Sequence, residues 1–253
     1  MRPVEGLTRD AFLGGKLSIR QPEQGYRAGI DPVLLAAAVP AAPGQSVLEL
    51  GCGVGVASLC LGVRVPGLTL TGVELQPVYA ELARGNARAN GIALDIVTAD
   101  LAALPASLRA RGFDHVIANP PYHLRARGSA APDPGRETAL GEATPLALWV
   151  ETAARRLAPR GWLTLIQRAE RLPGLLGTLD TRLGSVEILP LAARPGRPAK
   201  LVLLRARKGG KSAFRLHSPL ILHEGSRHER DGDSYVPTIS DVLRRGAALP
   251  WPV

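Results

Sequence analysis

Residues 46–55 read SVLELGCGVG, and they decide the fold. The apolar run from Ser46 to Leu50 is typical of a parallel strand that is buried on both faces. A glycine turn, Gly51 to Gly55, follows directly. A strand, a tight glycine turn and a helix begin a nucleotide-binding βαβ unit, because glycine lets the backbone approach a ligand closely. The sixth position of the turn is Val56 instead of the glycine of the dinucleotide fingerprint, so a pyrophosphate is not expected.

Three more strands are predicted at residues 69–74, 94–98 and 113–118, and each is followed closely by polar groups. Glu74 ends the first of them, where an acidic side chain can accept hydrogen bonds from both ribose hydroxyls and disfavours NADP. Asp100 follows the second strand, where it either binds a ligand or caps the next helical turn. Because the carboxyl ends of parallel strands meet at one edge of a sheet, we expect these groups to lie near the glycine turn.

The motif Asn119-Pro120-Pro121-Tyr122 follows the last of these strands. Two prolines cannot continue a sheet ladder, so the backbone is stiff and extended and its carbonyls are left free. Asn119 adds a side-chain acceptor, and Tyr122 adds a flat aromatic face. These groups suit a planar ligand with an exocyclic amine. An ordinary turn after a strand is the alternative, but the other polar features on the same edge favour a ligand site.

The remaining sequence is expected to complete a single domain, residues 1–253, with an N-terminal extension and helix (1–42), a core (43–207) and a basic tail with a helix (208–253). Asp31 is a good N-cap, and residues 1–24 carry little secondary-structure signal. The short linker between the last two strands predicts an antiparallel pair. The other predicted elements are helices at 29–39, 56–61, 77–90, 145–157, 172–183 and 235–246, a turn at 159–161, and strands at 162–167, 186–189 and 200–206.

Composition narrows the class of protein. The 253 residues are 45% hydrophobic, which supports a sizeable core. Two cysteines, Cys52 and Cys60, do not make a disulfide framework, and both fall in a segment that we expect to be buried. No apolar run is long enough to span a bilayer, and the first residues lead into no signal-peptide core. We therefore expect a cytoplasmic protein without a membrane partner, an obligate protein partner or a metal.

The net charge is +9, and most of the excess lies between Ile188 and His223, a span with eight Lys and Arg and no Asp or Glu. This stretch is either a solvated basic face or a surface for a phosphate backbone, and its concentration favours the second. A long loop at residues 123–141 adds more Arg and has the length of a lid or binding loop. The candidate RNA-contacting residues are Arg125, Arg127, Arg194, Arg197, Lys200, Arg205, Arg207, Lys208 and Lys211.

Taken in order, these motifs resemble the class I S-adenosylmethionine-dependent methyltransferases. The resemblance is carried by Glu49 to Gly55, Glu74, Asp100 and Asn119 to Tyr122. In that family the NPPY motif marks methylation of an amine. The segment Gly29 to Leu35 and the tail around Tyr235 are similar to one branch, the tRNA1(Val) adenine N6-methyltransferases, which act on the adenine beside the anticodon. Cys52 departs from the usual small residues of the glycine turn, but it is small enough for the turn to form.

The resemblance implies a Rossmann-like α/β fold, with a mostly parallel seven-stranded sheet, an antiparallel last strand and helices on both faces. It implies S-adenosylmethionine as cofactor, and a target adenine that stacks on Tyr122 and donates its amine hydrogens to Asn119 and the Pro120 carbonyl. The implied catalytic residues are Asn119, Pro120, Pro121 and Tyr122. The implied cofactor-binding residues are Asp31, Glu49, Gly51, Cys52, Gly53, Gly55, Glu74, Leu75, Asp100, Leu101 and Asn119.

Other functions compete with adenine methylation in tRNA. The same motif could bind a base amine of ribosomal RNA, or the glutamine side chain of a translation release factor, although the basic stretch suits RNA better. A non-catalytic RNA-binding module would not need an intact glycine turn, Glu74 and NPPY together. A nicotinamide dehydrogenase is disfavoured because the third glycine is missing and hydride transfer does not require NPPY.

Overall fold

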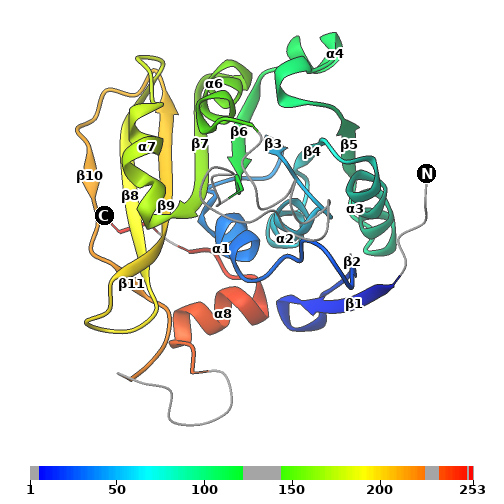
Figure 1. The fold of residues 1–253 in the computed structure, drawn as a ribbon, viewed down its shortest axis with the longest axis horizontal. Coiled ribbons are helices and arrows are strands. Elements are labelled where there is room, and N and C mark those ends of the chain that lie inside the picture. The colour runs from blue at the N-terminus through cyan, green and yellow to red at the C-terminus, as the bar shows by residue number, and fades with distance from the viewer. Residues whose placement is uncertain (1–5, 122–143, 226–233, 250, 253) are drawn as a thin grey trace.

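A computed structural model describes residues 6–121, 144–225, 234–249 and 251–252, and one large sheet organises them (Figure 1). Its main strands are β3 (Ser46–Leu50), β4 (Thr69–Glu74), β5 (Leu94–Thr98), β6 (Phe113–Ala118), β7 (Leu157–Arg168), β8 (Leu183–Ala192) and β9 (Ala199–Lys208). They lie in the order β8-β9-β7-β6-β3-β4-β5, and only β9 runs antiparallel to its neighbours. The predicted seven-stranded sheet is confirmed, and two short strands, β10 (Arg215–Leu216) and β11 (Leu220–Ile221), extend it beside β8.

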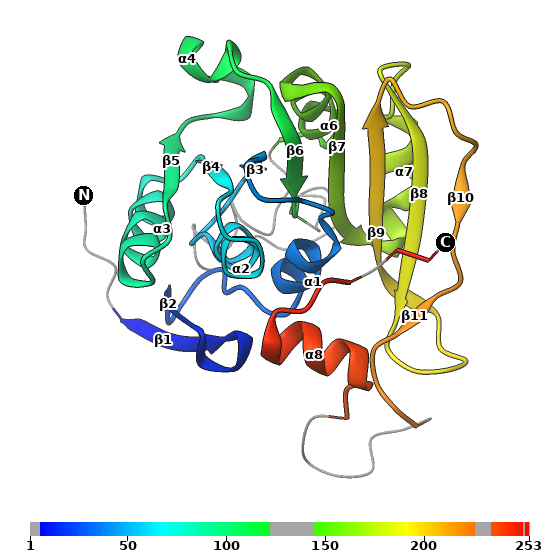
Figure 2. The same cartoon turned by 180° about the vertical axis from the view of Figure 1, so that it is seen from behind.

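Helices cover both faces of the sheet because successive strand residues point to opposite sides and both sides are apolar. One core cluster includes Ile117 and Ile166, and the cluster on the other face includes their neighbours Val116 and Leu165. Helix α7 lies in front of the sheet in Figure 1 and behind it in Figure 2, which is the opposite view. The first cluster contains residues of α1 (Asp31–Ala38), α2 (Val56–Arg64), α3 (Pro77–Ala89) and α8 (Pro237–Arg245); the second contains residues of α4 (Ala106–Arg109), α6 (Leu146–Arg156) and α7 (Leu172–Gly177).

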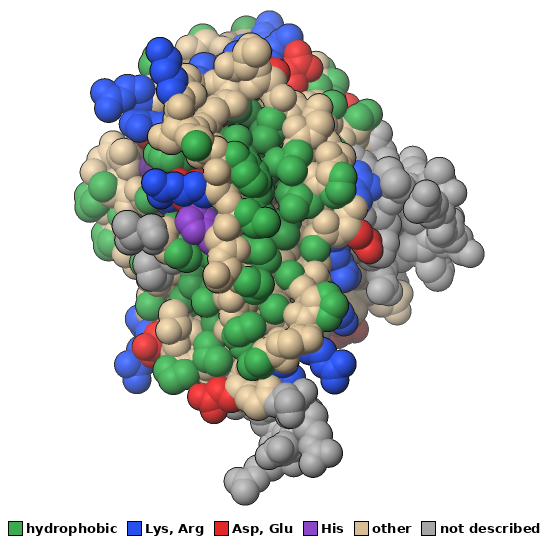
Figure 3. All heavy atoms as spheres, turned by 90° about the vertical axis from the view of Figure 1, so that its left-hand side faces the viewer, with side chains coloured by type: hydrophobic (Ala, Val, Ile, Leu, Met, Phe, Trp, Pro, Cys, Tyr) green, Lys and Arg blue, Asp and Glu red, His purple; other side chains and the backbone are tan. Residues whose placement is uncertain are grey.

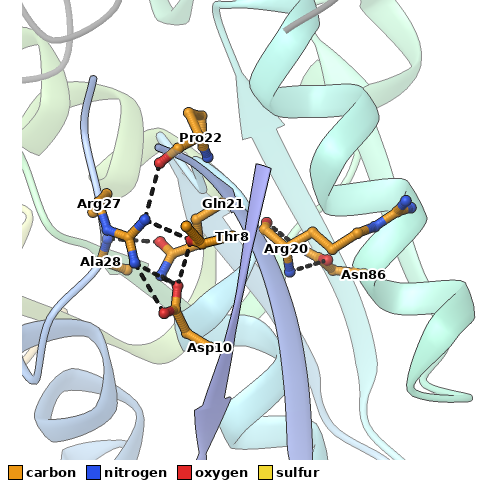
Figure 4. A network of polar contacts seen from close by, with 8 residues as sticks. All are labelled: Thr8, Asp10, Arg20, Gln21, Pro22, Arg27, Ala28 and Asn86. Carbon is orange, nitrogen blue, oxygen red and sulfur yellow. Dashed lines mark hydrogen bonds and ion pairs between the residues drawn. The ribbon is translucent and has the colours of Figure 1, made fainter. Parts of the chain in front are cut away.

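An N-terminal hairpin, which the sequence did not predict, packs beside α3. Its antiparallel strands, β1 (Leu7–Phe12) and β2 (Leu17–Pro22), are joined by the 3-10 turn η1 (Leu13–Gly15). The buried side chain of Asn86 accepts a hydrogen bond from the Arg20 backbone N–H (2.8 Å) and donates one to the Arg20 carbonyl (3.1 Å), as Figure 4 shows. Asn90, the residue that caps the end of α3, pairs with Ser18 in the same way. The two side-chain amides thus bond the backbone N–H and carbonyl groups of β2 that a neighbouring strand would otherwise bond.

Several predicted boundaries differ from the structure. The expected turn at 159–161 belongs to β7, where a Cβ on Gly161 would lie 2.9 Å from the carbonyl oxygens of Phe113 and Asp114. The helix expected at 172–183 is shorter in the structure and ends at Gly177. The last residue of the expected helix, Leu183, is instead the first residue of β8. Asp31 is the first residue of α1, and Ile30 takes the N-cap position that we expected for Asp31.

Candidate active site

A cavity opens at the edge of the sheet where β3, β4 and β6 end, and most of the predicted site residues line it. They are Glu49, Gly51, Cys52, Gly53, Glu74, Leu75, Asp100, Leu101, Asn119, Pro120 and Pro121. Gly55 and Asp31 are not part of this lining. Tyr122 lies outside the described residues. The shared edge therefore brings together eleven side chains or backbone positions that are spread over about 70 residues of sequence.

The glycine turn is shaped by two neighbours that are distant in sequence. Gly51 has a φ of +64°, and a Cβ there would lie 2.5 Å from the six-membered ring of Trp149 on α6. Any side chain at this position is excluded both by backbone strain and by contact. The Cys52 N–H donates to the Val73 carbonyl (2.9 Å), which fastens the turn to the end of β4. The turn thus leaves its backbone bare toward the cavity.

Glu74 joins the end of β4 to the glycine turn. One carboxylate oxygen accepts a hydrogen bond from the Gly53 N–H and the other from the Gln76 N–H, both at 2.8 Å. Glu74 is only 7% exposed, and burial raises its pKa, while the backbone donors partly offset that rise. The Leu75 N–H also acts on this carboxylate. A carboxylate has about four lone-pair sites, so the three backbone donors leave at least one for a hydroxyl group of a bound ligand.

Glu49 anchors the start of α2 to β3. Its buried carboxylate accepts hydrogen bonds from the backbone N–H (2.9 Å) and the hydroxyl (2.5 Å) of Ser58. Burial raises the pKa of Glu49 to about 7, although the bonds from Ser58 act in the opposite direction. This carboxyl group therefore changes its charge near neutral pH while it faces the cavity.

The Asn119-Pro120 segment offers two acceptors at the mouth of β6. The Oδ1 atom of Asn119 is buried and has no hydrogen-bond partner in the described part of the chain. The carbonyl of Pro120 accepts one hydrogen bond, from the Gln167 amide at 3.3 Å, and a carbonyl oxygen can accept two. A buried acceptor without a partner is costly, so this segment suits a ligand that carries N–H groups.

The sequence did not identify three aromatic residues of the cavity: Tyr26, Tyr79 and Trp149. The Tyr26 N–H donates to the Tyr79 hydroxyl (3.1 Å), and burial, with the nearby charge of Asp31, raises the pKa of the Tyr26 hydroxyl. Trp149 is 7% exposed, and its indole N–H has no partner among the described residues. Contacts with distant parts of the chain, such as Tyr79 on α3, place Tyr26 beside the glycine turn, so a local sequence pattern could not reveal it.

Polar contacts tie the Tyr26 segment to the N-terminal hairpin (Figure 4). The guanidinium of Arg27 pairs with the carboxylate of Asp10 at 2.8 Å. Gln21 donates to the same carboxylate (2.9 Å), and its carbonyl oxygen accepts from the Ala28 N–H (2.8 Å). Gln21 is 1% exposed, so a buried side-chain amide of the hairpin holds the segment that carries Tyr26.

The basic stretch does not form one free surface. Arg205 pairs with Glu187 (2.9 Å) and lies over the rings of Trp162 and Trp251. The Lys208 ammonium donates to a backbone carbonyl, that of Leu157 (2.6 Å).

The other five predicted RNA contacts of this stretch divide into two groups, those that bind protein carbonyls and those that are exposed. Arg207 donates to the Arg160 carbonyl, and Arg194 to carbonyl groups of residues 224 and 225. Arg197, Lys200 and Lys211 are exposed. On the face shown in Figure 3, hydrophobic side chains form a band and Lys and Arg lie toward its margins. Arg125 and Arg127 lie outside the described residues.

The position of β9 separates these exposed cations. Because β9 runs antiparallel to β7, the 193–198 connection that precedes it lies at the edge where β6 and β7 end, which is the edge of the cavity. Arg197 and Lys200 belong to that end of the sheet. Lys211 follows the other end of β9. Only the first two are on the cavity side.

Comparison with known proteins identifies the family. The family model described as "Methyltransferase small domain" matches residues 28–190. The chain belongs to this family of methyltransferases. The methyltransferase is 33% identical over 207 residues to a Porphyromonas gingivalis protein named tRNA1(Val) (adenine(37)-N6)-methyltransferase, with 78% of this chain and 80% of the relative covered. A Yersinia pestis protein of the same name is 30% identical over 211 residues, with 79% and 81% covered.

The structure of this methyltransferase is similar to solved ones. A crystal structure of a predicted O-methyltransferase from Agrobacterium tumefaciens superposes with a TM-score of 0.70 at 26% identity, and the match covers 88% of this chain and 100% of the other. The fold is that of the class I enzymes, and the cofactor is S-adenosylmethionine. The described residues contain no group of three His, Cys, Asp or Glu side chains placed to hold a metal. No helix in this part of the methyltransferase combines the length and apolar character needed to cross a membrane.

Proposed function

We propose that this methyltransferase methylates the exocyclic amine of an adenine in RNA, and that its substrate is a tRNA with the target beside the anticodon. The observation that carries the proposal is that the buried Asn119 Oδ1, beside the Pro120 carbonyl, has no hydrogen-bond partner among the described residues. An adenine amine has two hydrogens, and these two acceptors can take one each. The names of the curated relatives, which specify adenine 37 and tRNA1(Val), support the same substrate. Such a substrate would place its action in the cytoplasm.

The cavity residues fit S-adenosylmethionine, which supplies a methyl group on a positively charged sulfur. We assign the cofactor's ribose to Glu74, whose carboxylate keeps acceptor capacity beyond its backbone donors. The backbone of Gly51 and Gly53, which line the cavity, would lie beside the cofactor. Leu75 is 45% exposed at the cavity and offers an apolar surface for the adenine ring. Asp100 caps η2 (Leu101–Ala103) by accepting from Ala102, and its carboxylate can still accept from the cofactor's adenine amine.

In this mechanism the protein orients the target amine. Asn119 Oδ1 and the Pro120 carbonyl accept its two hydrogens, so the nitrogen lone pair points away from both acceptors and toward the methyl group. No strong base is required beforehand, because the methylated nitrogen is acidic and releases its proton to solvent afterwards. The rate enhancement then comes from orientation and electrostatics. Stacking of the flipped base on Tyr122 remains a prediction.

For RNA contact we retain the two exposed cations at the cavity edge, Arg197 and Lys200, and the predicted loop residues Arg125 and Arg127. The cations that contact protein groups, Arg205 and Lys208 among them, are less available to phosphates.

The direct test is methylation of total RNA from a cell that lacks this protein. Purified enzyme and labelled S-adenosylmethionine are added, and the RNA is digested for nucleoside analysis. We expect labelled N6-methyladenosine in the tRNA fraction, and an initial rate of labelling about 10²-fold lower with the Asn119→Ala variant. Parallel reactions contain ribosomal RNA or a release factor. Label found only in ribosomal RNA, or only on a glutamine of the release factor, would refute the tRNA assignment.

A further inference from the structure

Gln167 is a buried polar residue that contacts the proposed target-binding segment. It is the penultimate residue of β7, it is 1% exposed, and it follows the apolar residues Leu165 and Ile166. Its amide nitrogen donates to the Pro120 carbonyl at 3.3 Å, and its oxygen accepts from the Arg168 N–H at 2.8 Å. The two contacts together fix which end of the amide faces Pro120. A reversed amide would bring two acceptors together there and two donors together at Arg168.

The position of Pro120 explains why a side chain is needed. The parallel pairing of β6 with β7 ends at Ala118, opposite Leu165. Prolines have no N–H, so the ladder cannot continue through residues 120 and 121. A buried carbonyl still requires a donor. Gln167 supplies that donor from the neighbouring strand, and it uses only one of the two lone pairs of the oxygen.

We propose that Gln167 is a positioning residue for methyl transfer, which acts by fixing the direction of the Pro120 carbonyl. With one lone pair held by Gln167, the other is directed at the target amine. The inference rests on the proposed function, because it requires that this carbonyl accept a hydrogen of the amine. Without the hydrogen bond from Gln167, both lone pairs of the carbonyl are open, so the amine hydrogen can bind at either one and the amine is no longer held in one orientation. The nitrogen lone pair then points at the methyl group in only part of the bound complexes.

Two substitutions separate this role from structural support. Gln167→Met keeps the length of the side chain but can form neither hydrogen bond. Gln167→Glu, assayed at pH 8.5, keeps an acceptor for the Arg168 N–H and removes the donor toward Pro120. The matched control is Thr164→Val on the same strand, which removes a buried hydroxyl that has no partner among the described residues.

The measurements are the single-turnover rate at saturating tRNA and cofactor, the affinities for each, and the melting temperature. We expect both Gln167 variants to lose about 10-fold or more in rate, with both affinities within about twofold of wild type, and Thr164→Val to keep its rate. A Gln167→Glu variant with the wild-type rate would show that only the bond to Arg168 matters and would overturn the inference. A loss seen only in affinity or melting temperature would overturn it too. An inactive wild type would reject the proposed function, and with it this inference.

Discussion

Replacement of Asn119 by Ala should lower the activity of the enzyme without lowering its stability. A buried acceptor without a hydrogen bond costs about 1–3 kcal/mol, and the substitution removes that acceptor. The carboxamide group that is lost also contributes packing, which offsets part of the gain. We therefore expect the free energy of unfolding of the ligand-free protein to stay unchanged or to rise by up to about 2 kcal/mol.

The rate of methyl transfer should fall by about 10², because a misoriented reacting group loses roughly that factor. Urea denaturation gives the first quantity, and single-turnover kinetics at saturating cofactor and tRNA give the second. Asn119→Asp is the matched control, since it keeps an acceptor oxygen in the same place, and it should transfer methyl faster than Asn119→Ala. A variant Asn119→Ala that is destabilised by more than about 2 kcal/mol and transfers at the wild-type rate would refute the reasoning.

Three other predictions concern the cofactor, pH and RNA. Glu74→Ala should weaken S-adenosylmethionine binding by roughly 1–3 kcal/mol, and unchanged affinity by calorimetry would remove Glu74 from the site. The pKa of Glu49 is about 7 in the folded protein and lower when unfolded, so the folded state binds more protons between these values. The free energy of unfolding should fall as pH rises from about 4.5 to about 7, and a Glu49→Gln variant that keeps this slope in denaturation curves would contradict the assignment. Arg197→Ala with Lys200→Ala should flatten the log–log salt dependence of tRNA binding by about 0.7–0.9 for each phosphate that is no longer neutralised, whereas Lys211→Ala should not; equal slopes for all would mean that the cavity edge does not contact the backbone.

The strands of the cofactor half could be predicted from the sequence with the bounds found in the structure. The runs 46–50, 69–74, 94–98 and 113–118 are apolar, and they end at glycine, acidic residues or proline, so local chemistry defines both ends. The N-terminal hairpin could not be predicted, because β2 is paired by side chains of Asn86 and Asn90 from a helix about 70 residues away.

The residues of the candidate site also fall into two groups, those that local motifs predict and those that only tertiary contacts bring to the cavity. Residues that belong to local motifs, such as Glu74 and Asn119, line the cavity as the sequence indicated. Trp149 and Gln167 were missed, since each reaches its neighbour across the sheet: Trp149 packs on Gly51, and Gln167 donates to Pro120. A tryptophan in an amphipathic helix, or a glutamine at the end of a strand, has no local signal for such a contact.

The antiparallel strand β9 affects how the chain folds during synthesis. It occupies the place between β8 and β7, so the outer edge of β7 has no partner until residues 201–207 have been made. At a ribosomal rate of about 5–20 residues per second, the 40 residues from Arg168 to Lys208 take about 2–8 s. During that interval β7 presents an open edge, which is a template for aggregation. Most of the cavity lining comes from residues 26–121 and has already been made, so cofactor bound to the nascent core would stabilise it by mass action before the sheet is complete.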